Sequence, residues 1–591
     1  MNIVVLIGIV ITLVTGIPVL LQLLKNHPRG LIILFFAEMW ERFSYYGMRG
    51  ILIFYLTQHL LFDDETAGAQ YGSYTSLVYL LPLVGGLLAD RWLGTRKAVA
   101  FGALLLVAGH LTMAVEGRPS TQALTYAGQS YQISAEGRMD SREVRLIIAG
   151  QPHAFGPAEG GGLKIESLPA NAALPAVLPK GSYTIETQSD PLGKTAFYLA
   201  ISLIIVGVGF LKPNISTIVG QLYPQGDPRR DAGFTLYYYG INLGAFWASV
   251  LCGLLGETVG WWAGFGLAGV GMAAGFIVFV LGKKHLMGKG EPPVPEALTR
   301  KVAGPLNVEW LIYGLGLLGV IPIWLLVQSN QLVGWALGIS TVVALAFIAW
   351  FLVARCDKVE RERMLLAMVL IFGSVVFFTL FEQAGTSLNL FADRNVDLQG
   401  ISAAQTQSFN AGFILIFAPI FAALWAWLAS RNLDLNPVMK FGLGLIQVGL
   451  GFLVVVWAQG MADDQFRMPL VILALLYMLH TTGELFLSPV GLSQITKLSV
   501  ASIVSFMMAV WFLASSIAQY VGGIIAGAMG TETVGGQVLD PAAALATSID
   551  GFNKLGWAGI GCGVVFIGLS YLIRHWDHGA NTTTAPPKRE A

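Results

Sequence analysis

Charged residues are scarce in this sequence. Asp, Glu, Lys and Arg make up only 12% of its 591 residues, whereas 55% of the residues are hydrophobic. A water-soluble domain of this length carries far more charge, so the composition argues against a soluble fold. Apolar runs of about 20 residues or longer recur along the chain and match the thickness of a bilayer. The sequence therefore predicts an integral membrane protein with about fifteen membrane-spanning helices.

Net charge and clustered cysteines are also lacking. The formal net charge is zero, which gives no reason to expect a nucleic-acid partner. Cys252, Cys356 and Cys562 lie far apart and provide neither a disulfide framework nor a metal-binding cluster. We therefore expect no metal site, no cofactor and, because no catalytic-triad spacing occurs, no enzyme. An intramembrane enzyme or a receptor is the alternative from another class, and solute accumulation would exclude it.

Polar breaks and basic links organise the chain. The apolar run at 3–24 lacks the features of a signal peptide, so we expect a retained N-terminal helix. The break at 117–192 contains short β-rich segments, the first of them at 124–134, and the break at 282–304 resembles a linker. The basic segments between the spans occur at alternate connections, so all of them fall on one side of the membrane. The positive-inside rule then predicts a cytoplasmic C-terminus and places 117–192 outside the cell.

Ionisable residues within apolar spans are the most informative feature. Five residues of one span fall on a single helical face at 100° per residue, namely Glu38, Glu41, Arg42, Tyr45 and Arg49. Three further ionisable residues lie in other spans, namely Lys212, Glu382 and Glu484.

Such charges are costly in lipid. Each would cost roughly 2.5–3.5 kcal/mol at the membrane centre, so we expect them to face a shared polar cavity. The alternative is a set of static ion pairs that hold helices together. Four carboxylates meet three bases, however, and a buried carboxylate without a cation would take up a proton near neutral pH. The separated cations and anions also suit a zwitterion such as a short peptide.

Several segments together resemble a known family. Residues 38–43 read Glu-Met-Trp-Glu-Arg-Phe and resemble the E-x-x-E-R-F signature of proton-dependent oligopeptide transporters, a branch of the major facilitator superfamily. The resemblance covers nearly all of 31–575, and the other matching segments are 86–97, 210–216, 239–245, 381–385 and 483–492.

The resemblance implies an all-α integral membrane protein with the major facilitator fold. Two six-helix bundles would enclose a cavity at mid-membrane, with a helix pair inserted between them in sequence. The extra N-terminal helix and the small external β-rich insertion depart from the family pattern. We expect an N-terminal helix and linker (1–30), helices 1–3 of the N-terminal bundle (31–116), the insertion (117–192), helices 4–6 (193–282), a cytoplasmic linker with the helix pair (283–361), helices 7–12 of the C-terminal bundle (362–575) and a cytoplasmic tail (576–591).

The resemblance also implies roles for single residues. Arg49 would hold the peptide carboxylate, Glu484 would hold the peptide ammonium group, and Glu382 would be protonated and exchange a salt bridge with Arg49. Lys212 would pair with the region of Glu41 or with Glu484 as the gates move. The family's proton-coupling positions correspond to Glu38, Glu41, Arg42 and Glu382. Its other cavity-lining positions correspond to Tyr45, Tyr46, Tyr79, Asn242 and Trp511, although ordinary helix packing is an equal alternative for each aromatic ring.

The resulting hypothesis is a proton-coupled symporter that imports di- and tripeptides by alternating access. Protons are the coupling ion, the bilayer of a bacterial inner membrane is the expected location, and a monomer is the expected state. A proton would neutralise Glu382 or the pair of Glu38 and Glu41 and so free Arg49 for the peptide. A proton-driven exporter and a carrier of nitrate or drugs are the alternatives within the same superfamily.

Overall fold

The computed structural model describes residues 2–138, 141–158, 161–168, 172–224, 227–431, 433, 435–487 and 491–580. Two predictions fall partly outside these residues. They are residues 488–490 of the family motif at 483–492, and residues 581–591 of the predicted tail.

Long apolar helices form the body of the molecule. Within the described residues, fourteen helices are long and apolar enough to cross a membrane. A further long helix, α2 (Arg29–Phe54), has an apolar sequence interrupted by Glu38, Glu41, Arg42 and Arg49. The prediction of a multi-pass, mainly helical membrane protein is therefore confirmed.

The helices follow the predicted order of two halves with an inserted pair. The N-terminal half consists of α2, α3 (Asp64–Leu80), α4 (Pro82–Leu88), α5 (Thr95–Met113), α6 (Pro191–Gln221), α7 (Arg229–Thr258) and α8 (Trp261–Leu281). The connecting region contains α9 (Pro295–Thr299), β9 (Lys301–Ala303), β10 (Leu306–Asn307), α10 (Val308–Leu318), α11 (Val320–Val327) and α12 (Asn330–Ala354). The C-terminal half contains α13 (Lys358–Phe381), α14 (Ser387–Asn395), α15 (Ser408–Ser430), α16 (Pro437–Trp457), α17 (Leu470–Leu487), α18 (Gly491–Leu498), α19 (Val504–Ala528) and α20 (Pro541–Leu572).

Three of the long helices begin at an Asp-Pro or Asn-Pro pair. The side chains of Asp190, Asn436 and Asp540 each accept a hydrogen bond from a backbone N–H in the first turn of α6, α16 and α20. Proline follows at the first helical position, where its missing N–H costs no hydrogen bond. These local signals define where each helix enters the bundle.

A β-rich unit lies between α5 and α6. Five antiparallel strands pair in the order β4-β3-β2-β1-β8, and three more pair in the order β5-β6-β7. The segment predicted at 124–134 is two strands, because the chain turns at Ala127 and Gly128, both with positive φ. The strands are β1 (Thr121–Tyr126), β2 (Gln129–Glu136), β3 (Glu143–Ile148), β4 (Gln151–His153), β5 (Phe155–Ala158), β6 (Gly162–Ile165), β7 (Val177–Leu178) and β8 (Tyr183–Gln188).

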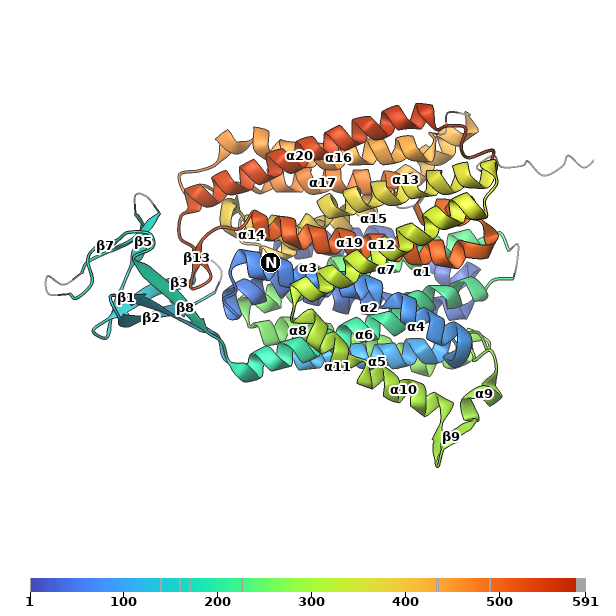
Figure 1. The fold of residues 1–591 in the computed structure, drawn as a ribbon, viewed down its shortest axis with the longest axis horizontal. Coiled ribbons are helices and arrows are strands. Elements are labelled where there is room, and N and C mark those ends of the chain that lie inside the picture. The colour runs from blue at the N-terminus through green and yellow to red at the C-terminus, as the bar shows by residue number, and fades with distance from the viewer. Residues whose placement is uncertain are drawn as a thin grey trace, which may run out of the picture.

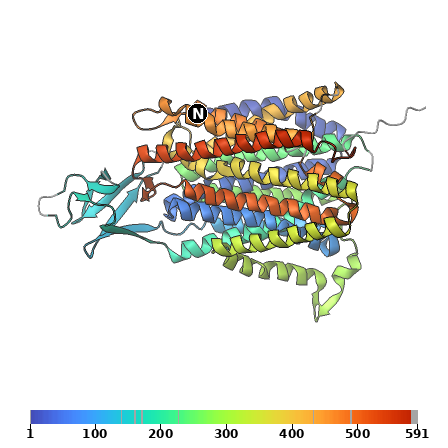
Figure 2. The ribbon, with the colours of Figure 1, turned by 45° about the horizontal axis from the view of Figure 1, so that its top comes forward.

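This unit projects from one end of the helical body, and α9 with β9 lies at the opposite end (Figure 1). The second view keeps the strands outside the helices at the same end (Figure 2). We call these the strand end and the linker end. Short strand pairs complete the structure: β11 (Val396–Asp397) with β12 (Met468–Pro469), and β13 (Thr533–Val534) with β14 (Gln537–Val538).

Two peripheral elements connect the halves along their sides. The first helix, α1 (Ile3–Asn26), bonds to α7 through Thr12 and Trp247 (3.0 Å) and to the C-terminal half through Asn2 and Gln405 (2.8 Å). The inserted pair meets both halves at Asn330. The side-chain oxygen of Asn330 accepts a hydrogen bond from Ser73 of α3 (2.6 Å), and its backbone oxygen accepts one from Tyr520 of α19 (2.9 Å).

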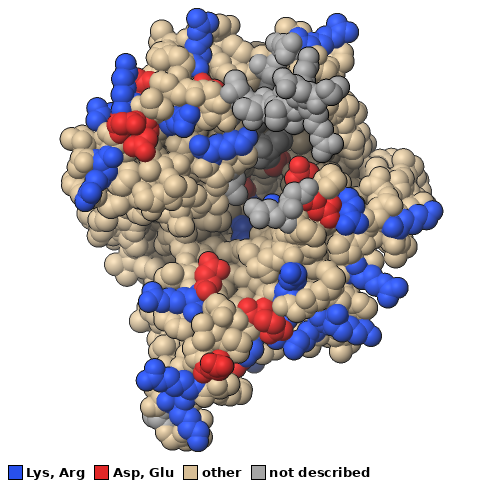
Figure 3. Space-filling model, turned by 90° about the vertical axis from the view of Figure 1, so that its right-hand side faces the viewer, with Lys and Arg blue, Asp and Glu red and all other residues tan. Residues whose placement is uncertain are grey.

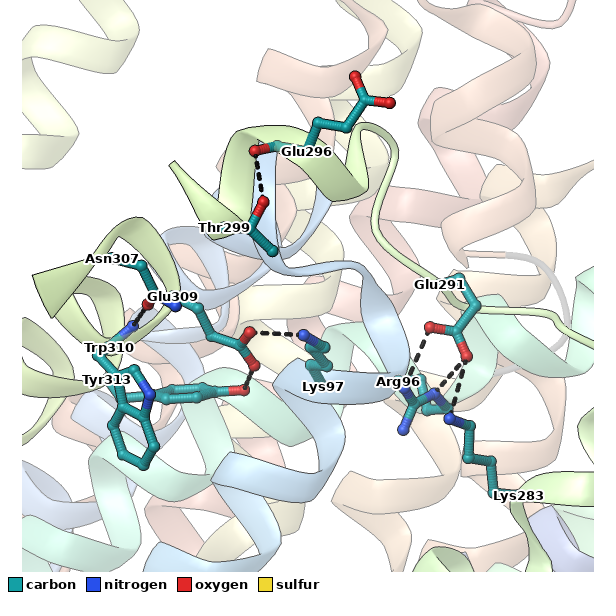
Figure 4. Close-up of polar contacts among 10 residues, drawn as sticks. All are labelled: Arg96, Lys97, Lys283, Glu291, Glu296, Thr299, Asn307, Glu309, Trp310 and Tyr313. Atoms are coloured by element: carbon teal, nitrogen blue, oxygen red, sulfur yellow. Dashed lines mark hydrogen bonds and ion pairs between the residues drawn. The ribbon is translucent and has the colours of Figure 1, made fainter. Parts of the chain in front are cut away.

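At the linker end, the region after α8 is tied to the first turn of α5 (Figure 4). Arg96 donates two hydrogen bonds to Glu291, at 2.9 and 3.0 Å, and Lys97 lies 2.7 Å from Glu309 at the start of α10. These pairs fix the position of the linker and of the helix that follows it.

Candidate functional site

Two carboxylates share one guanidinium in the middle of α2. Arg42 Nε lies 2.8 Å from Glu38 Oε1 and 2.9 Å from Glu41 Oε2. Glu38 and Arg42 are four residues apart, so they meet on one helical face. All three side chains are buried, with Glu41 fully so. The cluster itself holds one more carboxylate than guanidinium groups, and the Lys212 ammonium on α6 lies within electrostatic range of both carboxylates.

A cavity of about 180 Å³ lies between the two halves. Helices α2, α3 and α7 form one wall, and α13, α15 and α17 form the other. Both walls contribute ionisable side chains. Six of the predicted site residues line the cavity, namely Tyr46, Arg49, Tyr79, Asn242, Glu382 and Glu484.

Arg49 joins the two walls. Its guanidinium pairs with Glu382, which follows the end of α13 in a short 3-10 turn (382–385). Arg49 Nε also donates to the hydroxyl of Tyr71 at 2.6 Å. Sequence reasoning did not predict this tyrosine, which α3 buries beside the cavity. The phenol fixes the orientation of a cation that faces both the cavity and the opposite half.

Glu484 provides an acidic group on the C-terminal wall. It accepts a hydrogen bond from Asn410 Nδ2 at 3.3 Å, and the same amide donates to Thr481 Oγ1 at 2.9 Å. Asn410, Tyr238 and His480 line the cavity but were not predicted. His480 precedes Glu484 by four residues, so helical spacing from the motif at 483–492 was a signal that could have identified it.

Three of the residues predicted to bind substrate are not among those that line this cavity. Lys212 Nζ lies 3.7 Å from the ring centroid of Tyr79, so it contacts a cavity-lining ring from α6. Tyr45 is buried and packs edge-to-face on Tyr46, with centroids 5.3 Å apart. Trp511 packs so closely on Gly491 that a Cβ there would lie 2.5 Å from its ring. The substrate-binding roles given to these residues stay predictions.

Direct contacts close the cavity at the strand end. Arg394 of α14 makes two hydrogen bonds to Asp64 of α3, at 2.6 and 2.7 Å, and the backbone N–H of Thr531 donates to the same carboxylate at 2.8 Å. Nearby, Glu257 of α7 accepts from the backbone N–H of Ala404 at 2.8 Å. The face at the linker end is hollowed at its centre instead (Figure 3). The molecule is therefore closed at the strand end.

Among the described residues, no group of three or more His, Cys, Asp or Glu side chains could hold a metal ion. The arrangement offers chemistry of another kind, because it presents a cation and carboxylates on opposite walls of one cavity.

Comparisons with known proteins agree on one family. The profile of the POT family, designated PTR2, matches residues 96–539. The uncharacterized transporter YclF of Bacillus subtilis is 35% identical over 516 residues, which cover 85% of this chain and 88% of that protein. The peptide transporter YePEPT of Yersinia enterocolitica is 31% identical over 526 residues, with the same coverage. The dipeptide and tripeptide permease A of Pectobacterium carotovorum is 28% identical over 540 residues, covering 90% of this chain and 88% of that one.

Solved structures show the same similarity. A crystal structure of a peptide transporter POT in complex with alafosfalin has a TM-score of 0.69 and 31% identity, covering 93% of this chain and 96% of that one. A POT family transporter in complex with 5-aminolevulinic acid has a TM-score of 0.68 and 26% identity, covering 93% of this chain and 97% of that one.

Proposed function

Because this chain belongs to the POT family, we propose that it imports di- and tripeptides across the membrane together with protons. It is a multi-pass membrane transporter and not an enzyme. The names of two relatives, a peptide transporter and a dipeptide and tripeptide permease, support the substrate class. The major facilitator fold with two halves and an inserted helix pair supports alternating access as the mechanism.

The observation that carries the proposal is the arrangement of charge in the cavity. Arg49 lies on the N-terminal wall, whereas Glu382 and Glu484 lie on the C-terminal wall. A short peptide carries a carboxylate at one end and an ammonium group at the other. Arg49 would bind the carboxylate through charge-assisted hydrogen bonds, and Glu484 would bind the ammonium group. Binding of one peptide to both walls would couple substrate to the closure of the cavity.

Proton coupling is proposed at two places. Glu382 forms a salt bridge with Arg49 in this conformation. A proton on Glu382 would weaken this salt bridge and release Arg49 for the peptide carboxylate. In the cluster of Glu38, Glu41 and Arg42, a proton on one carboxylate would balance the single guanidinium. A proton on Glu382 would leave Arg49 with a positive charge that the peptide carboxylate would balance, whereas a proton on Glu38 or Glu41 would remove one negative charge from the buried cluster. The coupling ion is thus handled by side chains alone.

We place the linker end in the cytoplasm and the strand end outside. Lys and Arg side chains gather on the face at the linker end (Figure 3), as the positive-inside rule expects of a cytoplasmic surface. The C-terminal end of α20 then lies inside the cell, and the bacterial inner membrane is the proposed location. With the strand end closed, the structure corresponds to a state that faces the cytoplasm.

The test is uptake of labelled dialanine into liposomes that contain the purified protein, with and without an inward proton gradient. We expect the wild type to accumulate dialanine with the gradient, and Glu41→Gln to catalyse only downhill exchange. Glu186→Gln in exposed β8 is the matched control and should behave as the wild type. If neither the wild type nor the control moves dialanine, the peptide proposal fails, and nitrate and drugs become the substrates to test.

A further inference from the structure

The β-rich unit is part of the N-terminal half by its covalent connections. The chain enters the unit from α5 and continues from it into α6. The unit also contacts the N-terminal half at two places. The backbone N–H of Ser120 donates to His59 O at 2.9 Å. Arg138 donates to Gly256 O at 3.0 Å, and its guanidinium lies 5.7 Å from the ring centroid of Trp261. The unit therefore moves with the N-terminal half.

The same unit also holds a hairpin of the C-terminal half. This hairpin, β13–β14, joins α19 to α20. Val534 at its tip is only 2% exposed and belongs to the apolar core of the β-rich unit, together with Leu124 and Leu146. The backbone N–H of Gly535 donates to Gln122 Oε1 at 2.7 Å, and Lys180 lies 3.8 Å from Glu532. The hairpin is thus embedded in a unit that belongs to the other half.

Arg142, just before β3, bridges the two halves. Its Nε and Nη2 donate to Gly535 O of the hairpin at 3.0 and 2.6 Å, and Nη2 also donates to Gln58 O at the end of the α2 region at 2.9 Å. Gln537 Nε2 donates in return to the backbone oxygen of Arg142. One guanidinium therefore connects backbone oxygens from both halves.

The turn of the hairpin is shaped for this contact. Gly535 and Gly536 both have positive φ, +60° and +76°, as a two-residue hairpin turn requires. A Cβ on Gly536 would lie 3.0 Å from Thr57 O, and a Cβ on Gly535 would lie 2.6 Å from Val144. Only a glycine pair lets the turn fit between residues 57–58, which follow α2, and the β-rich unit.

We propose that the β-rich unit is an outer clasp of the transport cycle, with Arg142 as its gating residue. The inference rests on the proposed alternating access. When the strand end opens, the outer ends of the two halves separate, so the hairpin must leave the unit and Arg142 must release either Gly535 or Gln58. Beneath the clasp lies a second cavity of about 350 Å³, lined by Arg142, Glu257 and Asp393, where the entrance for external peptide would form. The clasp therefore sets how readily the outward-facing state forms.

A reversible cross-link tests the clasp directly. Lys180→Cys and Glu532→Cys place thiols on the two sides at exposed positions, and a short bifunctional thiosulfonate reagent can join them. We expect the cross-link to reduce dialanine uptake by about tenfold or more, and dithiothreitol to restore it. Each single variant and the wild type, treated with the same reagent, should keep full uptake. Wild-type uptake by the cross-linked protein would overturn the proposal.

A second experiment needs no transported substrate, so it separates failure of the clasp from failure of the peptide proposal. Spin labels at Glu65→Cys and Asp464→Cys, with Cys562→Ser, report the distance between the outer ends of the halves in nanodiscs. Arg142→Ala should increase the population with the longer distance by roughly tenfold. The control is Arg145→Ala, which removes a half-buried β3 side chain that pairs with Glu143, and it should leave the distance unchanged. An unchanged distance distribution in Arg142→Ala would contradict the gating role. The cross-link test uses other variants, so it does not depend on whether Arg142→Ala folds.

Discussion

At the scale of single residues, Tyr71 orients the cation that we assign to the peptide carboxylate. Tyr71→Phe removes the hydroxyl that accepts from Arg49 Nε but keeps the ring against the guanidinium. A hydrogen bond to a charged group is worth about 1.5–3 kcal/mol, so the Michaelis constant for dialanine should rise by roughly tenfold with the maximal rate little changed. Tyr313→Phe, which removes a bond to Glu309 outside the cavity, is the control. An unchanged Michaelis constant would show that Arg49 needs no support from Tyr71.

Glu484 is predicted to recognise the ammonium group of the substrate. The wild type should therefore transport dialanine much faster than N-acetyl-dialanine, which has no ammonium group. Glu484→Gln should lower uptake of dialanine by about tenfold or more and reduce this discrimination, because one charge-assisted contact is lost. Competition between the two peptides in proteoliposomes measures the effect. Full discrimination in Glu484→Gln would assign the ammonium group to another carboxylate.

The sequence alone predicted some of these contacts, the family resemblance suggested others, and some residues were missed. Helical periodicity alone placed Glu38 with Arg42, because they are four residues apart. The pair of Arg49 with Glu382 joins residues 333 positions apart, so only the family resemblance could suggest it. Tyr71 and Asn410 were missed because an uncharged polar residue in an apolar helix is common and carries no sign of its partner.

At the scale of elements, the Arg96–Glu291 pair ties the linker to the first turn of α5 (Figure 4). Hydrogen bonds from Arg96 lower the pKa of Glu291 below its ordinary value of 4.5. A lowered folded-state pKa stabilises the fold above the ordinary pKa, and this contribution is lost as the pH falls through the folded-state value. The pair thus contributes at neutral pH and not in acid.

Glu291→Gln should therefore lower the melting temperature at pH 7 by only about 1–2 °C, since a partly exposed ion pair contributes at most about 1 kcal/mol. The difference from the wild type should vanish in acid, below the lowered folded-state pKa of Glu291. Thermal unfolding in detergent at both pH values measures it. Glu296→Gln, whose backbone rather than side chain is bonded to Thr299, should match the wild type at both. A difference that persists in acid would contradict an ionic origin.

Element boundaries were less predictable than element types. The span predicted through Glu382 is interrupted there, because α13 ends at Phe381 and a 3-10 turn precedes α14. The sequence turns polar at this point, with Glu382, Gln383 and Thr386, but apolar residues resume at Leu388, so a single span was predicted across the break. The β-rich character of 117–192 followed from local alternation, but its contact with a hairpin more than 350 residues later depends on tertiary structure.

At the scale of the whole molecule, the two halves come into backbone contact where α3 crosses α19 at the strand end. A Cβ on Gly68 would lie 2.8 Å from Gly523 O and from the backbone nitrogen of Gly527. Glycine at such a crossing lets two membrane helices approach to backbone contact. The overall fold was predictable from hydropathy and family motifs, whereas this contact was not, because the sequence contains 70 glycines and does not mark which of them lie where the two halves cross.

Gly68→Val should prevent the closure seen in this structure. The valine side chain has no space against the backbone of α19, so the strand end would stay open while each half keeps its own packing. We expect dialanine uptake to be lost, dialanine binding from the outer side to persist, and the distance between labels at Glu65→Cys and Asp464→Cys to be long. Gly338→Val on α12, where nothing lies within 4 Å, is the control and should transport normally. If Gly68→Val took up dialanine at the wild-type rate, closure at this crossing would not be a step of transport, because every cycle of alternating access must pass through a state that is sealed on the outer side.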